Sequence, residues 1–323
     1  MKKRIEIFCT LGPSSLNKSF LKFASNNIDL LRLNMSHLSL SKLEKNIKFI
    51  KNFSKIPICI DTEGAQIRTK CKRVKFLKKN QKIKIEKNSD FFLYPSEVIS
   101  KLKVNDKLEI GFRGLSIKLI KKLKSSFMCK VIEQGFLEPN KGVHVTNRKV
   151  NLNYLTDKDL EAIKIGKRHK IKFYALSFTN NERDVVKFNN LAVNENKIFK
   201  IETSEAIKNL SKIMKKGKNF LIDRGDLSKD VKIENIPLVQ RKIIALGKKQ
   251  KKNVYVATNF LESMIINSYP TRAEVNDIYN TIEMGSKGLV LAAETAVGKN
   301  PHNCIKILKK IIKAFKEKSK SKW

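Results

Sequence analysis

The sequence predicts an α/β protein, a (β/α)8 TIM barrel interrupted by a small all-β insertion. Three observations support this prediction. Short apolar runs alternate with longer stretches of helical spacing, the alternation recurs eight times, and it is suspended between residues 64 and 150. Strands that alternate with helices pair in parallel, and eight such units favour a closed barrel over an open doubly wound sheet.

The eight strand candidates are short apolar runs. They lie at residues 5–11, 28–35, 56–61, 173–178, 197–202, 219–223, 254–258 and 288–294. In the stretches that follow them, apolar residues recur every three or four positions, which predicts amphipathic helices. These helices are expected at residues 16–26, 41–54, 157–169, 182–194, 204–216, 238–251, 271–285 and 301–318.

Several predicted helices begin with a residue type that caps helix N-termini. The candidate caps are Ser41, Thr156, Ser204 and Thr271. Glu44, Asp159 and Glu274 stand three residues after Ser41, Thr156 and Thr271, which is the spacing of a capping box.

Residues 64–150 have a different pattern. Segments such as KIKIEK and KLEIG alternate with a period of two and are separated by Gly and Asn, which indicates short strands. We therefore expect a barrel domain at residues 1–63 and 151–323 and an inserted β-barrel domain at residues 64–150. Because loops at the carboxyl ends of barrel strands surround the active site, the insertion is expected to act as a lid.

The charge balance is strongly basic, with 68 Lys and Arg against 30 Asp and Glu and a formal net charge of +38. Nucleic-acid binding proteins usually gather such charge into a patch, whereas the lysines of this chain are spread through nearly every segment. We therefore expect no dedicated nucleic-acid site. The charge still favours anionic ligands by long-range attraction.

Cysteines and apolar runs indicate the cellular setting. The five cysteines form no C-x-x-C pair and no metal-binding spacing, as in reduced cytoplasmic proteins. No apolar run approaches the ~18 to 20 residues of a membrane span, and the N-terminus lacks the features of a signal peptide. The expected localisation is cytoplasmic, without a membrane partner.

Polar residues cluster where the predicted strands end, in RLNMS, DTEG, KIE, DRGD, ATNF and AAET. Barrel enzymes collect their catalytic residues at these ends. Side chains alternate along a strand, so Lys200 and Glu202 are expected on the same side. Glu202 and Asp226 offer the hard oxygen ligands that suit Mg²⁺ or Mn²⁺, and Arg32 and Lys200 are cations of the kind that bind a transferring phosphoryl group.

Phosphoryl transfer depends on positioning and charge neutralisation, and this combination of groups supplies both. The segment RGDLSKD adds a turn whose backbone N–H groups could hold a carboxylate or phosphate. The chain has no Walker A sequence and no glycine-rich loop of the protein-kinase type, which disfavours the two common ATP-binding designs.

Longer motifs carry a resemblance to a known family. The segments LRLNMSH, IDTEGAQIRT, FKIE, DRGDL, ATNFLESM and PTRAEVNDIYNTIEMGSKGLVLAAETAVGKNP resemble, in order and spacing, the motifs of pyruvate kinases. The similarity covers essentially the whole chain. It implies transfer of phosphate from phosphoenolpyruvate to ADP, giving pyruvate and ATP, with Mg²⁺ or Mn²⁺ and usually K⁺.

The resemblance also implies roles for individual residues. Lys200 and Arg32 would contact the transferring phosphoryl group, and Thr258 would lie beside the substrate and take part in protonating the enolate. Glu202 and Asp226 would bind the divalent metal.

Further positions match other ligand contacts of the family. Gly225, together with Asp226, would form the turn that binds the substrate carboxylate, and Arg68 would reach the nucleotide phosphates. The positions that match the K⁺ ligands are Asn34, Ser36, Asp61 and Thr62.

Some positions depart from the family pattern. Gln66 replaces the glutamate that accompanies K⁺ dependence, and the lysine of K⁺-independent members is absent, so the use of K⁺ stays open. Ala292 and Ala293 replace a serine and a glycine near the nucleotide. The phosphoenolpyruvate and metal residues are retained.

The chain ends soon after the last predicted helix, with KEKSKSKW. We therefore expect a truncated member without the C-terminal regulatory domain, in which any homo-oligomer would form through the barrel. Two alternatives to a pyruvate kinase remain. One is an enzyme of phosphoenolpyruvate or a related enol acid with another phosphoryl acceptor, and the other is an inactive scaffold or binding protein.

Overall fold

The structure is a computed structural model that describes residues 4–111 and 114–317. The chain divides into two compact units, Met1–Glu63 with Asp157–Trp323 and Gly64–Thr156. The boundaries of the second unit are Gly64 and Thr156, so residues 151–156 group with it.

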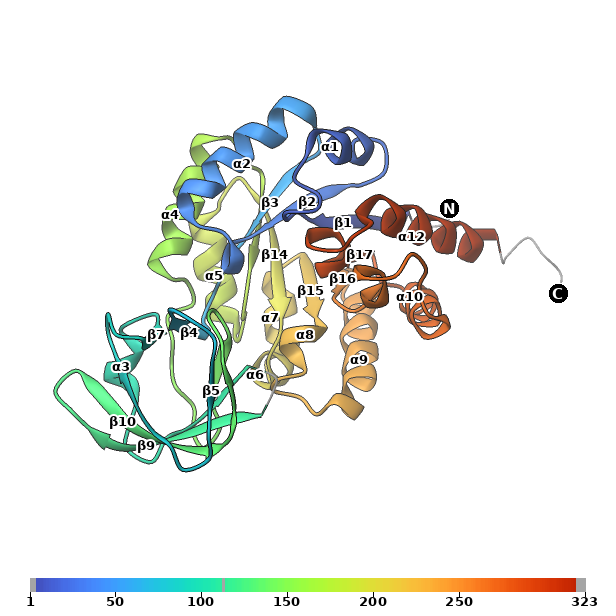
Figure 1. Ribbon diagram of the computed structural model, residues 1–323. Coiled ribbons are helices and arrows are strands. Elements are labelled where there is room, and N and C mark those ends of the chain that lie inside the picture. The colour runs from blue at the N-terminus through green and yellow to red at the C-terminus, as the bar shows by residue number, and fades with distance from the viewer. Residues whose placement is uncertain (1–3, 112–113, 318–323) are drawn as a thin grey trace. The chain divides into compact units, whose positions relative to one another are not determined.

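The first unit is built on eight parallel strands that close into a barrel (Figure 1). Around the barrel the strands follow the order β1-β17-β16-β15-β14-β13-β3-β2. Their bounds are β1 (Glu6–Thr10), β2 (Leu30–Asn34), β3 (Ile58–Asp61), β13 (Phe173–Leu176), β14 (Asn196–Ile201), β15 (Asn219–Asp223), β16 (Asn253–Ala257) and β17 (Gly288–Leu291). The predicted fold class is confirmed. The eighth strand is shorter than expected, because Ala293–Ala296 form the short helix α11.

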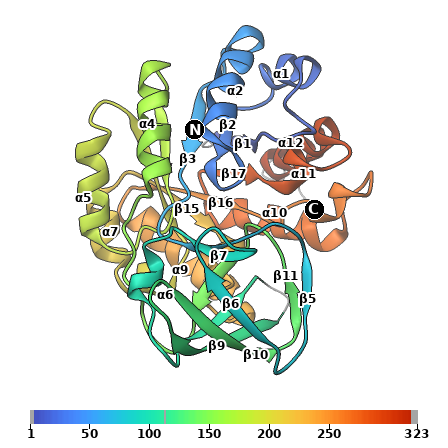
Figure 2. The ribbon, with the colours of Figure 1, turned by 60° about the vertical axis from the view of Figure 1, so that its left-hand side comes forward.

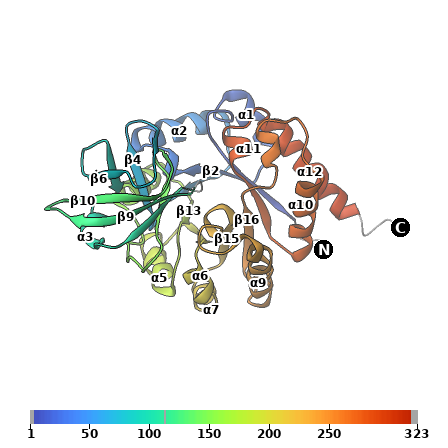
Figure 3. The same cartoon turned by 60° about the horizontal axis from the view of Figure 1, so that its bottom comes forward.

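Helices surround these strands (Figure 3). The longer ones are α1 (Lys18–Ala24), α2 (Leu40–Phe53), α4 (Asp157–Arg168), α5 (Glu182–Leu191), α7 (Leu210–Lys216), α9 (Ile236–Lys249), α10 (Arg272–Met284) and α12 (Pro301–Glu317). They bury an apolar face and expose a polar one; in α12, Cys304, Ile305 and Leu308 are fully buried. The predicted end of the last helix, residue 318, lies outside the described residues.

Helix caps agree with the sequence at Thr271 and differ at Ser41 and Ser204. Thr271 and Glu274 form the expected capping box of α10. Helix α2 is capped by Ser39 rather than Ser41, because the Ser39 hydroxyl accepts the Lys42 N–H at 3.3 Å. Thr203 rather than Ser204 caps α6 (Ser204–Lys208), since its hydroxyl accepts the Ala206 N–H at 3.0 Å.

The inside of the barrel is filled by one apolar layer to which every strand contributes. Phe8 and Tyr255 stack there with their ring centroids 4.5 Å apart. The buried members of the layer are Phe8, Leu30, Cys59, Ala175, Ile198, Leu221, Tyr255, Ala257 and Val290. Alternation along a strand returns the side chain two positions later to the same face. The layer therefore determines which residues line the barrel at the carboxyl ends of its strands.

The second unit is an antiparallel β domain (Figure 2). Seven strands pair in the order β6-β10-β9-β8-β12-β4-β7, and β11 pairs with β5. Their bounds are β4 (Ile67–Cys71), β5 (Lys75–Leu77), β6 (Lys82–Glu86), β7 (Phe91–Tyr94), β8 (Lys107–Ile110), β9 (Leu115–Lys122), β10 (Ser126–Glu133), β11 (Gly135–Leu137) and β12 (Gly142–Val145), and the short helix α3 (Val98–Lys101) follows β7. In the part of the chain that the structure describes, the hydrogen-bonded pairing of the larger sheet runs from β6 to β7.

This β unit has its own hydrophobic core, which includes Ile85, Leu108, Ile117, Phe127 and Val131, all fully buried. Alternate residues of its strands face this core, as in the segment Leu115–Leu119, so the period of two in the sequence reflects burial of one sheet face. Across both units, none of the described helices has the length and apolar content that a membrane crossing needs.

Candidate active site

A layer of polar and charged side chains lies directly beyond the apolar layer of the barrel. Leu30, Cys59, Ala175, Ile198 and Leu221 belong to the apolar layer. Two positions later on the same five strands or just after them stand Arg32, Asp61, Ser177, Lys200 and Asp223. All five are buried. The alternation of strand side chains thus brings these groups together at the carboxyl ends of the strands.

Lys200 lies among three carboxylates. Its Nζ atom is 2.7 Å from Oε1 of Glu202, 3.3 Å from Oδ2 of Asp223 and 3.4 Å from Oδ2 of Asp61. The side chain is only 4% exposed. Burial works against the charged form of Lys200, but these carboxylates outweigh it and raise the pKa of the ammonium above its ordinary value. Lys200 therefore remains charged at neutral pH.

Arg32 pairs with the same acidic groups. Its Nε donates to Oδ2 of Asp61 at 2.6 Å, and its Nη2 lies 3.7 Å from Oδ2 of Asp223. Burial opposes the charge of Arg32, yet Asp61 and Asp223 raise the pKa of the guanidinium. Arg32 and Lys200 thus form two fixed cations that share Asp61 and Asp223 as counter-ions.

Asp61 is held by neighbouring hydroxyl groups as well as by the cations. The Ser177 hydroxyl lies 3.2 Å from Oδ1 of Asp61 and 2.7 Å from the carbonyl oxygen of Thr62, and Lys200 Nζ lies 3.1 Å from that hydroxyl. The Thr62 hydroxyl accepts the Ser177 N–H at 3.0 Å. This network fixes the side chains of β3, β13 and β14 relative to one another.

Glu202 follows β14 and is fully buried. Its Oε2 accepts the N–H of Phe178 at 2.6 Å, from a residue with a φ of +52°. Burial raises the pKa of Glu202 to about 8; Lys200 opposes this shift, and the nearby Asp226 and Asp223 add to it. A bound cation would stabilise the charged form of such a buried carboxylate, which has two acidic neighbours.

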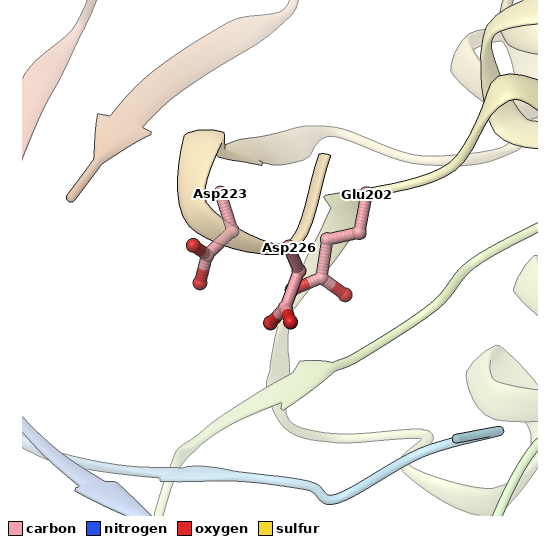
Figure 4. Close-up of side chains that lie close together, drawn as sticks. All are labelled: Glu202, Asp223 and Asp226. Carbon is pink, nitrogen blue, oxygen red and sulfur yellow. The ribbon is translucent and has the colours of Figure 1, made fainter. Parts of the chain in front are cut away.

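Three carboxylates converge at the turn between β15 and α8 (Arg224–Leu227) (Figure 4). Glu202, Asp223 and Asp226 each offer one oxygen, and these oxygens lie within 4.8 Å of one another. Oxygen ligands at this spacing suit Mg²⁺ or Mn²⁺, which bind a few carboxylates and complete their coordination with water and substrate oxygens. The residues present therefore fit a divalent metal ion.

The turn carrying Gly225 contacts Thr258, the residue after β16. The Gly225 N–H donates to the Thr258 hydroxyl at 2.9 Å, and Arg224 Nε donates to the Thr258 carbonyl oxygen at 3.1 Å. Arg224 is anchored by Asp277 at 2.7 Å and lies over the ring of Phe260. Thr258 has a φ of +75°, which is strained for a β-branched residue. Such strain is often found at functional sites, where surrounding contacts maintain it.

The remaining predicted site residues do not all belong to this cluster. Asn34 lies opposite Asp61 in the pairing of β2 with β3, and its Oδ1 accepts the Ser36 N–H at 3.0 Å. Arg68 is buried on β4 of the second unit, where its Nη1 donates to the Asn140 carbonyl oxygen at 3.3 Å. The structure thus brings together Arg32, Asp61, Lys200, Glu202 and Asp226, and it places Arg68 in the other unit.

Sequence reasoning missed Asp223 and Ser177. Asp223 is the last residue of β15, and the segment DRGD contained both it and Asp226. Its position two residues beyond the buried Leu221 was a usable signal, because the strand period places it on the barrel's inner face. Ser177 follows Ala175 in the same way.

Fold and site together define a class of protein, a (β/α)8 barrel that gathers paired cations and a cluster of carboxylates at the carboxyl ends of its strands. The family model described as the barrel domain of pyruvate kinase matches residues 2–305 of this chain. The chain belongs to the pyruvate kinase family.

Individual relatives give the same result. The chain is 33% identical to a pyruvate kinase of Thermotoga maritima over 97% of this chain and 71% of the relative. It is 35% identical to a pyruvate kinase of Methanocaldococcus jannaschii, over 98% and 70% respectively. The similarity to plastidial pyruvate kinase 3 of Arabidopsis thaliana is 31%, over 95% and 57%. The chain therefore spans only a little over half the length of some curated relatives and about 70% of others.

Proposed function

We propose that this chain transfers the phosphoryl group of phosphoenolpyruvate to ADP and so forms pyruvate and ATP. The observation that carries the proposal is the arrangement of Arg32 and Lys200, two buried cations placed beside the carboxylate cluster of Glu202, Asp223 and Asp226. Membership of the pyruvate kinase family supports the same reaction.

Glu202 and Asp226 are the residues proposed to bind Mg²⁺ or Mn²⁺. The bound ion would supply positive charge for the phosphoryl and enolate oxygens. Without it, Asp61, Glu202 and Asp223 face Arg32 and Lys200, and Asp226 pairs with Lys229, so four carboxylates stand against these three cations. This excess of acidic groups supports the assignment of a cation to the site.

Arg32 and Lys200 would bind the oxygens of the transferring group. In the proposed reaction the bond between phosphorus and the enol oxygen breaks, and a bond from phosphorus to a terminal phosphate oxygen of ADP forms. The two cations stabilise the charge that shifts onto the phosphoryl and enol oxygens. Asp61 contacts both cations and keeps them oriented.

Thr258 is proposed to deliver the proton that completes pyruvate. Its hydroxyl would transfer a proton to the methylene carbon of the enolate and recover one from water, so the net reaction takes up one proton. The hydroxyl is held by the Gly225 N–H on one side and lies 2.5 Å from the Ala257 carbonyl oxygen on the other. The turn of Gly225 and Asp226 would hold the substrate carboxylate, as the resemblance implies.

The monovalent site belongs to the same proposal. Its candidate ligands are Asn34, Ser36, Asp61 and Thr62. Asp61 already pairs with Arg32 and Lys200, and the Asn34 side chain caps the turn at Ser36. A comparison of turnover in K⁺ with turnover in tetramethylammonium decides whether these groups bind K⁺. The role of Arg68 toward the nucleotide is likewise a prediction, tested by the KM for ADP of Arg68→Ala.

The proposal is tested by incubating the purified protein with phosphoenolpyruvate, Mg²⁺ and ADP and following pyruvate. We expect turnover that requires all three. Metal-dependent binding of phosphoenolpyruvate without turnover on ADP would point instead to another phosphoryl acceptor. Failure to bind either phosphoenolpyruvate or ADP would favour the alternative of an inactive scaffold or binding protein.

A further inference from the structure

Asp223 makes contacts that the proposed reaction does not use. It is the last residue of β15 and is 4% exposed. Its Oδ2 lies 3.3 Å from Nζ of Lys200 and 3.7 Å from Nη2 of Arg32. These are the two cations proposed to bind the transferring phosphoryl group. Oδ2 of Asp223 therefore lies close to the same two cations that the phosphoryl group would contact.

The same carboxylate also faces the metal cluster. An oxygen of Asp223 lies within 4.8 Å of a ligand oxygen of Glu202 and of Asp226 (Figure 4). Without a divalent ion these neighbours repel Asp223, so its favourable partners are Lys200 and Arg32. With a divalent ion bound between Glu202 and Asp226, Asp223 has a second favourable partner on its other side.

We propose that Asp223 couples the binding of the divalent metal to the binding of the phosphate-bearing ligand. In the metal-free protein the Asp223 carboxylate adds negative charge beside Arg32 and Lys200 and opposes a phosphate anion. In the metal-bound protein its charge is shared with the ion, and the two cations become available to the anion. The inference rests on the proposed function, because it takes Glu202 and Asp226 as metal ligands.

The charges around the two cations set the direction of the effect. Arg32 and Lys200 face Asp61 and Asp223, and Lys200 also pairs with Glu202, so the two cations offer no net positive charge to an anion before the metal binds. Replacing Asp223 with Asn removes a negative charge that lies beside both cations in a buried site. Because a charge a few ångströms away acts strongly where water is excluded, metal-free affinity for phosphate should rise by at least ~10-fold.

The experiment measures the Kd of inorganic phosphate and of phosphoenolpyruvate by calorimetry at fixed ionic strength, once with EDTA and once with Mn²⁺. The proteins are the wild type, Asp223→Asn, Asp223→Ala and the control Asp90→Asn. Asp90 is an exposed residue of the second unit that pairs with Lys75, so its variant loses the same charge outside the site. Thermal unfolding of each variant verifies that it is folded.

We expect the wild type and Asp90→Asn to bind both anions much more weakly with EDTA than with Mn²⁺. Both Asp223 variants should bind the anions at least ~10-fold more tightly than the wild type in EDTA, which reduces the effect of the metal. If the wild type depends on Mn²⁺ and the Asp223 variants bind no more tightly in EDTA, the inference is wrong and the proposed function stands. If the wild type binds no Mn²⁺ in electron paramagnetic resonance titrations, both the metal assignment and the inference are wrong.

Discussion

Lys200 and Glu202 stand two residues apart at the end of β14 and form an ion pair with 2.7 Å between Nζ and Oε1. One residue thus belongs to the pair proposed to bind the phosphoryl group and the other to the carboxylate cluster. The pair joins the two halves of the proposed chemistry, because strand alternation turns both side chains to the inner face of the barrel.

Replacing Lys200 with Ala should lower kcat at least ~100-fold, because a buried cation that stabilises transition-state charge is lost. The control is Lys197→Ala on the same strand, where the side chain donates to the carbonyl oxygen of Ala192. Initial rates with saturating substrates give kcat for each variant. Near-wild-type turnover by folded Lys200→Ala would remove this lysine from the mechanism.

Replacing Asp61 with Asn should destabilise the barrel as well as slow the reaction. Asp61 is fully buried and pairs with both Arg32 and Lys200, so its loss leaves two buried cations with less compensation. Breaking a buried ion pair on one side costs about 3 kcal/mol of unfolding free energy. Urea unfolding measures this cost. A variant as stable as the wild type would show that the network carries no such energy.

Divalent metal should stabilise the folded protein. A ligand that binds only the native state adds about 2.7 kcal/mol at a concentration of 100 times its Kd. We expect Mn²⁺ to raise Tm and EDTA to reverse the rise, while Glu202→Gln and Asp226→Asn show a much smaller rise. An equal rise in both variants would mean that Mn²⁺ binds elsewhere.

Two substitutions of Thr258 distinguish a chemical role of its hydroxyl from a structural one. The substitution Thr258→Val keeps the shape and removes the hydroxyl that accepts the Gly225 N–H. If this hydroxyl delivers a proton, kcat should fall ~100-fold with little change in phosphoenolpyruvate affinity. Thr258→Ser, which keeps the hydroxyl, should retain most of the activity. Equal losses in both variants would contradict the proton-delivery role.

The capping box of α10 predicts a pH-dependent contribution to stability. Burial tends to raise the pKa of Glu274, but hydrogen bonds from Ser263 and Thr271 outweigh it and lower the pKa. A lowered folded-state pKa stabilises the protein above the unfolded-state pKa of about 4.5. That stability is lost as pH falls through the folded-state value.

Accordingly, Glu274→Gln should be less stable than the wild type at pH 7 by about 1 kcal/mol, and the difference should shrink below pH ~4.5. Urea unfolding across this pH range measures it. The control is Glu161→Gln, which alters an exposed pair with Lys164. A difference that is constant with pH would show that the charge of Glu274 does not matter.

The barrel could be predicted from the sequence because each of its strands is a buried apolar run, and each run is followed by an amphipathic helix. The ends of the helices are harder to predict from the sequence. The segment predicted as one helix at 204–216 is two, α6 and α7, because Asn209 leaves helical geometry and its side chain donates to the Asn180 carbonyl oxygen at 2.9 Å. Such a contact between distant loops has no local signal.

The candidate site, like the fold, could be predicted only in part from the sequence. Residues at strand ends could be proposed as neighbours, since parallel strands of a closed barrel end on one side. The positive φ values of Phe178 and Thr258 could not be predicted from the sequence, because both are ordinary residue types whose strain depends on tertiary contacts. Asp223 is harder to identify for a different reason, since the segment DRGD offers two aspartates and only the strand register distinguishes them.

The most direct test of the central claim is a ³¹P magnetic resonance measurement of the purified protein with phosphoenolpyruvate, ADP and Mg²⁺. We expect the phosphoenolpyruvate signal to be replaced by the γ-phosphate signal of ATP, with one pyruvate formed per ATP and at least ~100-fold slower conversion by Lys200→Ala. Pyruvate accompanied by inorganic phosphate instead of ATP, or no conversion by the folded wild type, would contradict the account.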